Sequence, residues 1–122
     1  MRAAFLAGVL ALAAPVLGWS ADTTDPAAGQ QVYETRCSFC HGEGGVGGQG
    51  PSLIGVAGRK AASVPNFAYT PALKASGLSW TPANLDRFLN NPAEAVPGTA
   101  MPMSVPDTKE RTDLIAYLAS LH

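Results

Sequence analysis

Two cysteines separated by two residues, with a histidine directly after them, restrict the fold of this chain more than any other feature. The pentapeptide CSFCH runs from Cys37 to His41, and Cys37 and Cys40 are the only cysteines among the 122 residues. Six glycines then stand in the ten positions 42–51. Because glycine populates many backbone conformations, this stretch predicts a loop that becomes ordered only by wrapping around something.

The cysteine pair has three chemical interpretations. A disulfide suits an exported protein with an even number of cysteines, but a catalytic pair begins a helix after a strand, whereas here a predicted helix precedes the pair. Zinc needs four ligands, and the only other histidine is His122. In haem attachment, thiols three residues apart share one face and bond the two vinyl groups, while His41 lies under the iron. Haem attachment is the interpretation that we favour.

The first 21 residues predict a secretory signal peptide. One basic residue, Arg2, precedes an uncharged stretch from Ala3 to Ser20, and small residues suited to cleavage follow the apolar run. That run contains Pro15 and is short for a bilayer span. We expect a leader at 1–21 and one domain at 22–122 that does not span the membrane and is exported to the periplasm. An uncleaved anchor is the alternative.

The charge of the remaining chain argues against nucleic acid as a partner. Beyond residue 21 there are seven Lys and Arg against nine Asp and Glu, a net charge of −2. Binding to phosphates needs a basic surface, which this balance does not provide.

Cap signals predict a small all-α domain with long loops. Asp25-Pro26 begins a helix that runs to about Arg36, Thr70-Pro71 begins a short helix that Gly77 stops, and Thr81-Pro82 begins another that Pro92 ends. Asp107 with Glu110 resembles a capping box before the last helix. The stretches from 42 to 69 and from 90 to 106 are predicted to be loops.

A haem iron needs a sixth ligand or an open position. A thioether is a soft ligand that favours ferrous iron, which suits electron transfer. Met101 and Met103 both lie in the second loop, far from the cysteines in the sequence. The sequence alone does not decide whether either methionine is an iron ligand or a hydrophobic side chain packed under the loop.

The mature chain resembles the class I c-type cytochromes, in the pattern of mitochondrial and bacterial cytochrome c. The matching segments follow CSFCH in order: GPSLIGVAGRK, NFAYT, GLSWT, FLNNP, PGTAM and DLIAYL. The resemblance covers the chain from about Gly29 to Leu121. It implies the cytochrome c fold, with crossing N- and C-terminal helices, two shorter helices and long loops around one covalent haem c.

The resemblance also implies roles for single residues. Thioether bonds fall at Cys37 and Cys40, the proximal iron ligand at His41 and the distal ligand at Met101, with Met103 as the alternative. The Pro51 carbonyl matches the acceptor of the other His41 ring proton. Further residues match positions at the haem propionates (Arg59, Tyr69 and Trp80) and at the helix crossing (Gly29, Tyr33, Leu114 and Tyr117).

Departures from the family pattern concern hydrogen bonds near the haem and surface charge. Leu73 stands where the family often has asparagine, and Phe88 where it often has tyrosine. The only lysines are Lys60, Lys74 and Lys109, so a lysine-ringed docking face is absent.

The resemblance implies a periplasmic one-electron carrier without enzymatic activity of its own. Its partners would be redox proteins: a dehydrogenase, a cytochrome complex or a terminal oxidase. One alternative is a cytochrome subunit that receives electrons from a periplasmic dehydrogenase. A haem peroxidase or gas sensor, which would need Met101 to leave the iron, is the other alternative.

Overall fold

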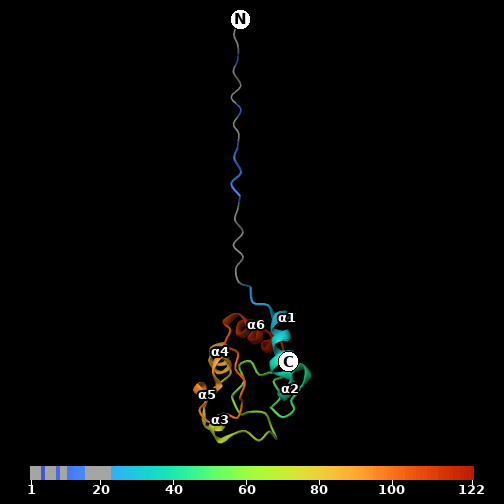
Figure 1. Ribbon diagram of the computed structural model, residues 1–122, viewed down its shortest axis with the longest axis vertical. Helices are drawn as coiled ribbons and strands as arrows, with labels where there is room; N and C mark the ends of the chain where they lie inside the picture. The colour runs from blue at the N-terminus through green and yellow to red at the C-terminus, as the bar shows by residue number, and fades with distance from the viewer. Residues whose placement is uncertain (1–3, 5–7, 9–10, 16–22) are drawn as a thin grey trace.

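The structure, a computed structural model, describes residues 4, 8, 11–15 and 23–122. The expected cleavage site of the signal peptide lies outside the described residues. Residues 11–15 are exposed and lie apart from the helical domain (Figure 1). In the described part of the chain, no helix has the length and hydrophobicity needed to cross a bilayer.

Helices and loops make up the domain, and the predicted all-α class is confirmed. The described residues contain no strand, only an isolated antiparallel bridge between Lys60 and Ser79. The helices are α1 (Pro26–Arg36), α2 (Ser38–His41), the 3₁₀ turn η1 (Glu43–Gly45), α3 (Pro71–Ala75), α4 (Pro82–Asn90), α5 (Pro92–Ala95) and α6 (Thr108–Ala119).

The predicted helix starts are confirmed with their caps. Side-chain oxygens of Asp25, Thr70, Thr81 and Asp107 each accept hydrogen bonds from backbone N–H groups in the first turn of the helix that follows. These bonds satisfy donors that a helix start otherwise leaves unpaired.

Two loop predictions were wrong in part. Pro92 was expected to end a helix, but it also begins α5, because the Asn91 side chain accepts from the Glu94 N–H and proline is well suited to a first turn. The glycine-rich stretch holds the short turn η1, with Gly44 at a positive φ of 62°. The remaining parts of both predicted loops are irregular.

Helices α1 and α6 cross closely, as predicted. A Cβ at Gly29 would collide with the backbone carbonyl of Asp113 and lie 2.9 Å from the Leu114 nitrogen, so only glycine fits there. The Tyr33 and Tyr117 rings pack across the crossing with centroids 5.3 Å apart. Figure 1 shows the two helices side by side at one end of the domain.

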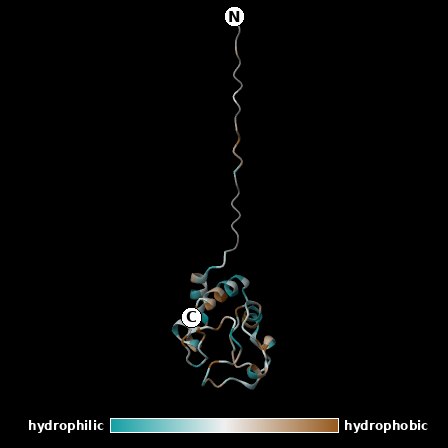
Figure 2. Cartoon of the chain, turned by 180° about the vertical axis from the view of Figure 1, so that it is seen from behind, coloured by the Kyte–Doolittle hydropathy of each residue, from teal (hydrophilic) through white to brown (hydrophobic). Residues whose placement is uncertain are grey.

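The core lies between this crossing and α4. Tyr33 and Leu114 are fully buried, and Leu85, Phe88 and Leu89 of α4 join Leu118 in the same cluster. Seen from behind, the hydrophobic residues of the helices alternate with hydrophilic ones on the outside of the domain (Figure 2). Several of these core residues, including Leu85, Phe88 and Leu118, also line a cavity of the domain.

Candidate functional site

One cavity of about 500 Å³ collects every site residue predicted from the sequence. Its lining includes the cysteines and histidine of CSFCH, the methionine of PGTAM and the three residues predicted at the propionates: Cys37, Cys40, His41, Met101, Arg59, Tyr69 and Trp80. The volume lies in the range of cavities that hold small-molecule ligands, roughly 300–1,000 Å³. Apolar side chains such as Leu73, Leu85 and Phe88 form much of the remaining wall.

The two thiols enter the cavity from one helical turn. Cys37 caps α2 and Cys40 lies within it, and both thiols are free. Burial raises the pKa of the Cys37 thiol to about 11, against a smaller lowering effect of Arg36. A redox-catalytic cysteine needs a lowered pKa, so this environment opposes the catalytic-pair interpretation.

His41 is oriented by a carbonyl and a glycine of the following loop. Its Nδ1 lies 2.8 Å from the Pro51 carbonyl oxygen, as the resemblance implied. Because that oxygen can only accept, Nδ1 is the donor and Nε2 carries the ring's lone pair. Gly50 packs against the ring, and a Cβ there would lie 2.8 Å from Cε1 of His41. The role of Gly50 was not predicted from the sequence.

Backbone hydrogen bonds hold the glycine-rich loop against α2. The N–H groups of Gly47 and Gly50 donate to the carbonyls of His41 and Cys40, each at 2.7 Å. The Tyr33 hydroxyl donates to the Gly42 carbonyl at 2.7 Å, and burial raises the pKa of Tyr33 to about 12. The loop is thereby fixed to the segment that it follows.

Met101 reaches the cavity from the loop between α5 and α6. It is partly buried, and its N–H donates to Thr99 Oγ1 at 3.3 Å. Met103 lines the same cavity but is 41% exposed. Of the two methionines, Met101 is therefore the more shielded from solvent.

A buried arginine that the sequence did not reveal fixes the end of this loop. Arg111 Nη1 donates to the carbonyls of Val105 and Pro106 at 3.1 and 2.8 Å, and Nε donates to Asp86 at 2.9 Å. From the sequence, Arg111 would be expected to be an exposed residue of α6, because no local pattern indicates that it is buried. Arg111 thus joins the methionine loop to α4 and α6.

Of the three residues predicted at the propionates, Arg59 and Trp80 lie on segments joined by a backbone hydrogen bond, and Tyr69 bonds within its own loop. Arg59 Nη1 and Nη2 donate to the carbonyls of Ile54 and Ser52, while its buried Nε has no hydrogen-bond partner among the described residues. The backbone N–H of Trp80 donates to the Arg59 carbonyl at 2.8 Å, and the Tyr69 hydroxyl accepts from the backbone N–H of Val64. An unpaired buried donor is costly, so Arg59 Nε calls for an acceptor inside the cavity.

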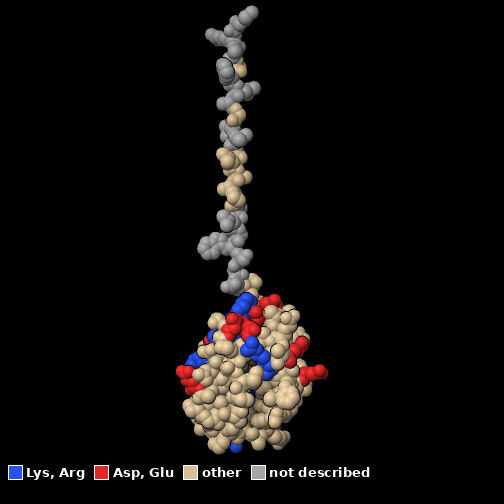
Figure 3. Space-filling view, viewed as in Figure 1, with Lys and Arg blue, Asp and Glu red and all other residues tan. Residues whose placement is uncertain are grey.

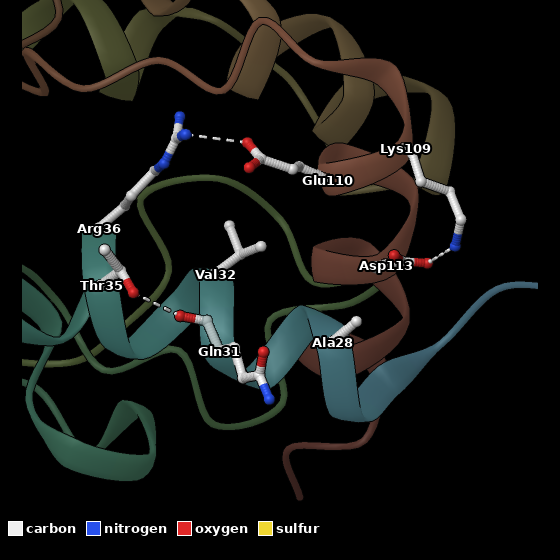
Figure 4. Close-up of a pocket in the computed structure, with 8 residues that line it drawn as sticks. All are labelled: Ala28, Gln31, Val32, Thr35, Arg36, Lys109, Glu110 and Asp113. Carbon is white, nitrogen blue, oxygen red and sulfur yellow. Dashed lines mark hydrogen bonds and ion pairs between the residues drawn. The ribbon is translucent and has the colours of Figure 1, made fainter.

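A second hollow, of about 350 Å³, lies on the α1–α6 crossing and contains none of the predicted site residues (Figure 4). Its edge carries two ion pairs, Arg36 with Glu110 at 2.9 Å and Lys109 with Asp113 at 2.6 Å. Because these charges neutralise one another, the hollow offers no unbalanced group to a ligand.

The residues of the main cavity fit a haem c. Two thiols three residues apart, an imidazole with a free Nε2 and a partly buried thioether form a suitable donor set. The apolar walls suit a porphyrin, and the unpaired Arg59 Nε suits a carboxylate. Within the described residues, no group of three or more His, Cys, Asp or Glu side chains could hold a metal ion by itself.

The comparisons with known proteins all match members of one family. The Cytochrome c family model matches residues 26–122. Cytochrome c2 of Rhodomicrobium vannielii is 41% identical over 119 residues, which are 93% of this chain and 94% of the relative. Cytochrome c of Tetrahymena pyriformis is 44% identical over 98 residues, 80% of this chain and 89% of the relative. The solved structure of cytochrome cH from Methylobacterium extorquens matches with a TM-score of 0.72 and 42% identity, over 77% of this chain and 96% of that one.

Proposed function

Because the chain belongs to the cytochrome c family, whose members carry a covalent haem c, we propose that it is a periplasmic one-electron carrier. Cys37 and Cys40 would hold the haem through thioether bonds, and His41 and Met101 would be the protein ligands of its iron. The bound haem supplies the redox chemistry, a one-electron change between ferric and ferrous iron. The observation that supports this most directly is the meeting of all four side chains at one cavity.

His41 acts as a ligand of fixed orientation. Its Nδ1–H donates to the Pro51 carbonyl at 2.8 Å, which fixes the tautomer and increases the basicity of Nε2. Gly50 lies close beside the ring, since a Cβ there would be only 2.8 Å from Cε1 of His41.

Met101 completes the coordination and closes the site to substrates. A thioether stabilises the ferrous state relative to harder ligands, which raises the reduction potential. Arg111 holds the loop that carries Met101, through the carbonyls of Val105 and Pro106. With His41 and Met101 both bound to the iron, no position would remain for a substrate, so the protein would transfer electrons without substrate chemistry of its own.

Polar and apolar groups of the cavity have separate tasks. Arg59, Tyr69 and Trp80 interact with the propionates, and Arg59 Nε gains the acceptor that it otherwise lacks. Leu73 and Phe88 exclude water where family members often place polar groups. The low dielectric that results strengthens the effect of each fixed charge on the iron.

Export to the periplasm belongs to the same proposal. Residues 1–21 act as a cleaved signal peptide and residues 22–122 form the functional domain. Its partners are redox proteins, a donor such as a dehydrogenase and an acceptor such as a cytochrome complex or terminal oxidase. Mass spectrometry of the mature protein tests the leader, since we expect an N-terminus close to Asp22; a retained Met1 or Arg2 would contradict export by cleavage.

Expression with haem-maturation machinery tests the ligands. We expect a low-spin spectrum with the far-red sulfur-to-iron band, and no binding of carbon monoxide to the ferrous protein. Met101→Ala should lose the band and bind carbon monoxide, whereas the matched variant Met103→Ala should retain the band. If the band survives in Met101→Ala, Met101 is not the ligand.

A further inference from the structure

Arg111 is a buried cation, and helix α4 supplies two of its partners. Its side chain is 8% exposed, although an arginine is seldom buried without a partner for its charge. Nε donates to the Asp86 carboxylate at 2.9 Å, and Nη1 donates to the Asn90 side chain at 3.2 Å. Asp86 and Asn90 are four residues apart in α4 and therefore lie on the same face of that helix.

The same guanidinium holds the end of the segment that carries Met101. We call residues 96–106 the methionine loop. Nη1 also donates to the carbonyls of Val105 and Pro106, at 3.1 and 2.8 Å, and the Val105 N–H donates to a carbonyl of α4 at 2.7 Å. Within the described residues, positions 102–104 make no hydrogen bond. The contacts at Val105 and Pro106 are therefore the first polar contacts that follow Met101 in the sequence.

The other ion pairs of α6 do not reach the methionine loop. On the face drawn in Figure 3, charges gather over the ends of α1 and α6. Two ion pairs of α6 include no residue of α4 or of the methionine loop: Arg36 with Glu110 and Lys109 with Asp113. In the described part of the chain, the ion pair that joins α6 to α4 is that of Arg111 with Asp86.

We propose that Asp86 is a positioning residue for Met101, and that it acts through Arg111 to keep the methionine loop closed. This inference rests on the proposed function, in which Met101 binds the iron. Without the carboxylate, a buried guanidinium loses the partner for its charge and turns toward water. The carbonyls of Val105 and Pro106 then lose their donor, and the loop opens more often. The Asp86 side chain is 45% exposed, so the hydrophobic core does not depend on it.

Binding of imidazole to the ferric, haem-loaded protein tests the proposal, because imidazole can reach the iron only after Met101 has left it. The reaction is followed by loss of the far-red band, and its rate at saturating imidazole equals the rate at which the loop opens. Asp86→Ala should raise this limiting rate about tenfold, equivalent to about 1.4 kcal/mol. Asp86→Asn should stay within about threefold of the wild type, because its amide oxygen still accepts a hydrogen bond.

A carboxylate outside the methionine loop separates loop opening from general stability. Asp113 accepts from Lys109 and from the Asp25 N–H, away from the Arg111 contacts. Asp113→Asn should lower the free energy of unfolding in urea yet leave the limiting rate within about twofold of the wild type. If Asp86→Ala opens no faster than Asp113→Asn, the proposal is wrong.

A double variant tests whether Asp86 acts through the guanidinium. In an Arg111→Lys background, the carbonyls of the methionine loop have already lost the donor that Asp86 holds in place. Asp86→Ala should therefore change the limiting rate by less than about threefold there, as expected for two residues that act as one unit. A full tenfold effect in that background would contradict a path through Arg111.

The wild-type spectrum distinguishes failure of this inference from failure of the proposed function. A ferric wild-type protein without the far-red band would refute Met101 as the ligand and would overturn this inference with it. An intact band, with equal limiting rates in the wild type and in Asp86→Ala, would overturn the role of Asp86 alone. A faster limiting rate in Asp86→Ala, with the band intact before imidazole is added, supports that role.

Discussion

The imidazole of His41 lies between a carbonyl that it bonds and a glycine that it touches. The Pro51 carbonyl could be expected from the family pattern, because its position relative to CSFCH is part of that pattern. The contact of Gly50 with His41 could not be expected, because nothing in the sequence distinguishes Gly50 from the other five glycines of the stretch. What distinguishes it is distance: a Cβ there would lie 2.8 Å from Cε1 and 2.9 Å from Nδ1 of His41.

Gly50→Ala should therefore move the ring or the loop. We expect the free energy of unfolding to fall by about 1–3 kcal/mol, the usual cost of overpacking, with a changed His41 ring signal in the NMR spectrum of the haem-loaded protein. Urea titration followed by circular dichroism gives the first quantity. Gly48→Ala is the control, because the nearest atom to its Cβ would be the Cys40 carbonyl oxygen at 3.1 Å, and the next two, at 3.9 Å, belong to Cys40 and Gly42 rather than to His41. Equal losses in the two variants would show that the His41 contact is not what makes Gly50 necessary.

Among the elements, the helices that begin with a polar cap followed by proline could be predicted, except α5, which begins in the same way. Thr70-Pro71 and Thr81-Pro82 were interpreted as starts, whereas Asn91-Pro92 was interpreted only as a stop. Proline has both effects, because it lacks the N–H needed inside a helix yet suits the first turn. The sequence does not show that α4 and α5 meet at this residue, since the bend between them depends on the extended backbone of Asn91, with φ −153°.

A carboxylate on α6 attaches the start of the domain to the helix crossing. Asp113 Oδ1 accepts from the Asp25 N–H at 2.8 Å and from Lys109 Nζ at 2.6 Å, and Lys109 also donates to the Thr23 carbonyl. The hydrogen bond from Lys109, followed by that from Asp25, lowers the pKa of Asp113 below its ordinary 3.8. The stabilisation is therefore full above pH 3.8 and is lost as the pH falls through the lowered pKa.

Asp113→Asn should lower the urea midpoint at pH 7, and the difference from the wild type should shrink at pH 3 and below. The reason is that the wild-type carboxylate itself becomes protonated as the pH falls through its lowered pKa. Asp107→Asn is the matched control, since asparagine caps a helix about as well as aspartate and should leave the midpoint nearly unchanged. A difference between Asp113→Asn and the wild type that is the same at all pH values would show that its charge is not involved.

At the scale of the whole molecule, the candidate site residues come from separate segments between positions 37 and 101, and all of them line one cavity together with Leu114 and Leu118 of α6. The family resemblance predicted the residues that line this cavity, whereas the sequence alone does not show contacts distant in sequence, such as Gly29 with Asp113. The convergence of these segments leaves a cavity of about 500 Å³ next to Trp80, Leu85 and Leu114. A core with a space of this size is incomplete without the group that fills it.

Cavity energetics predict that the chain without haem does not hold this structure. Without haem, the apolar side chains that line the cavity, such as Leu73, Leu85 and Phe88, would face water, and each Å² of apolar surface left exposed costs about 25 cal/mol. The wild-type chain made without haem attachment, with its thiols kept reduced, should therefore lose near-ultraviolet circular dichroism and cooperative thermal unfolding. Part of its helical signal should persist, because the caps of α1 and α6 are local. The haem-loaded protein is the control, and a sharp two-state transition in the haem-free chain would mean that the loops close over the cavity at little cost.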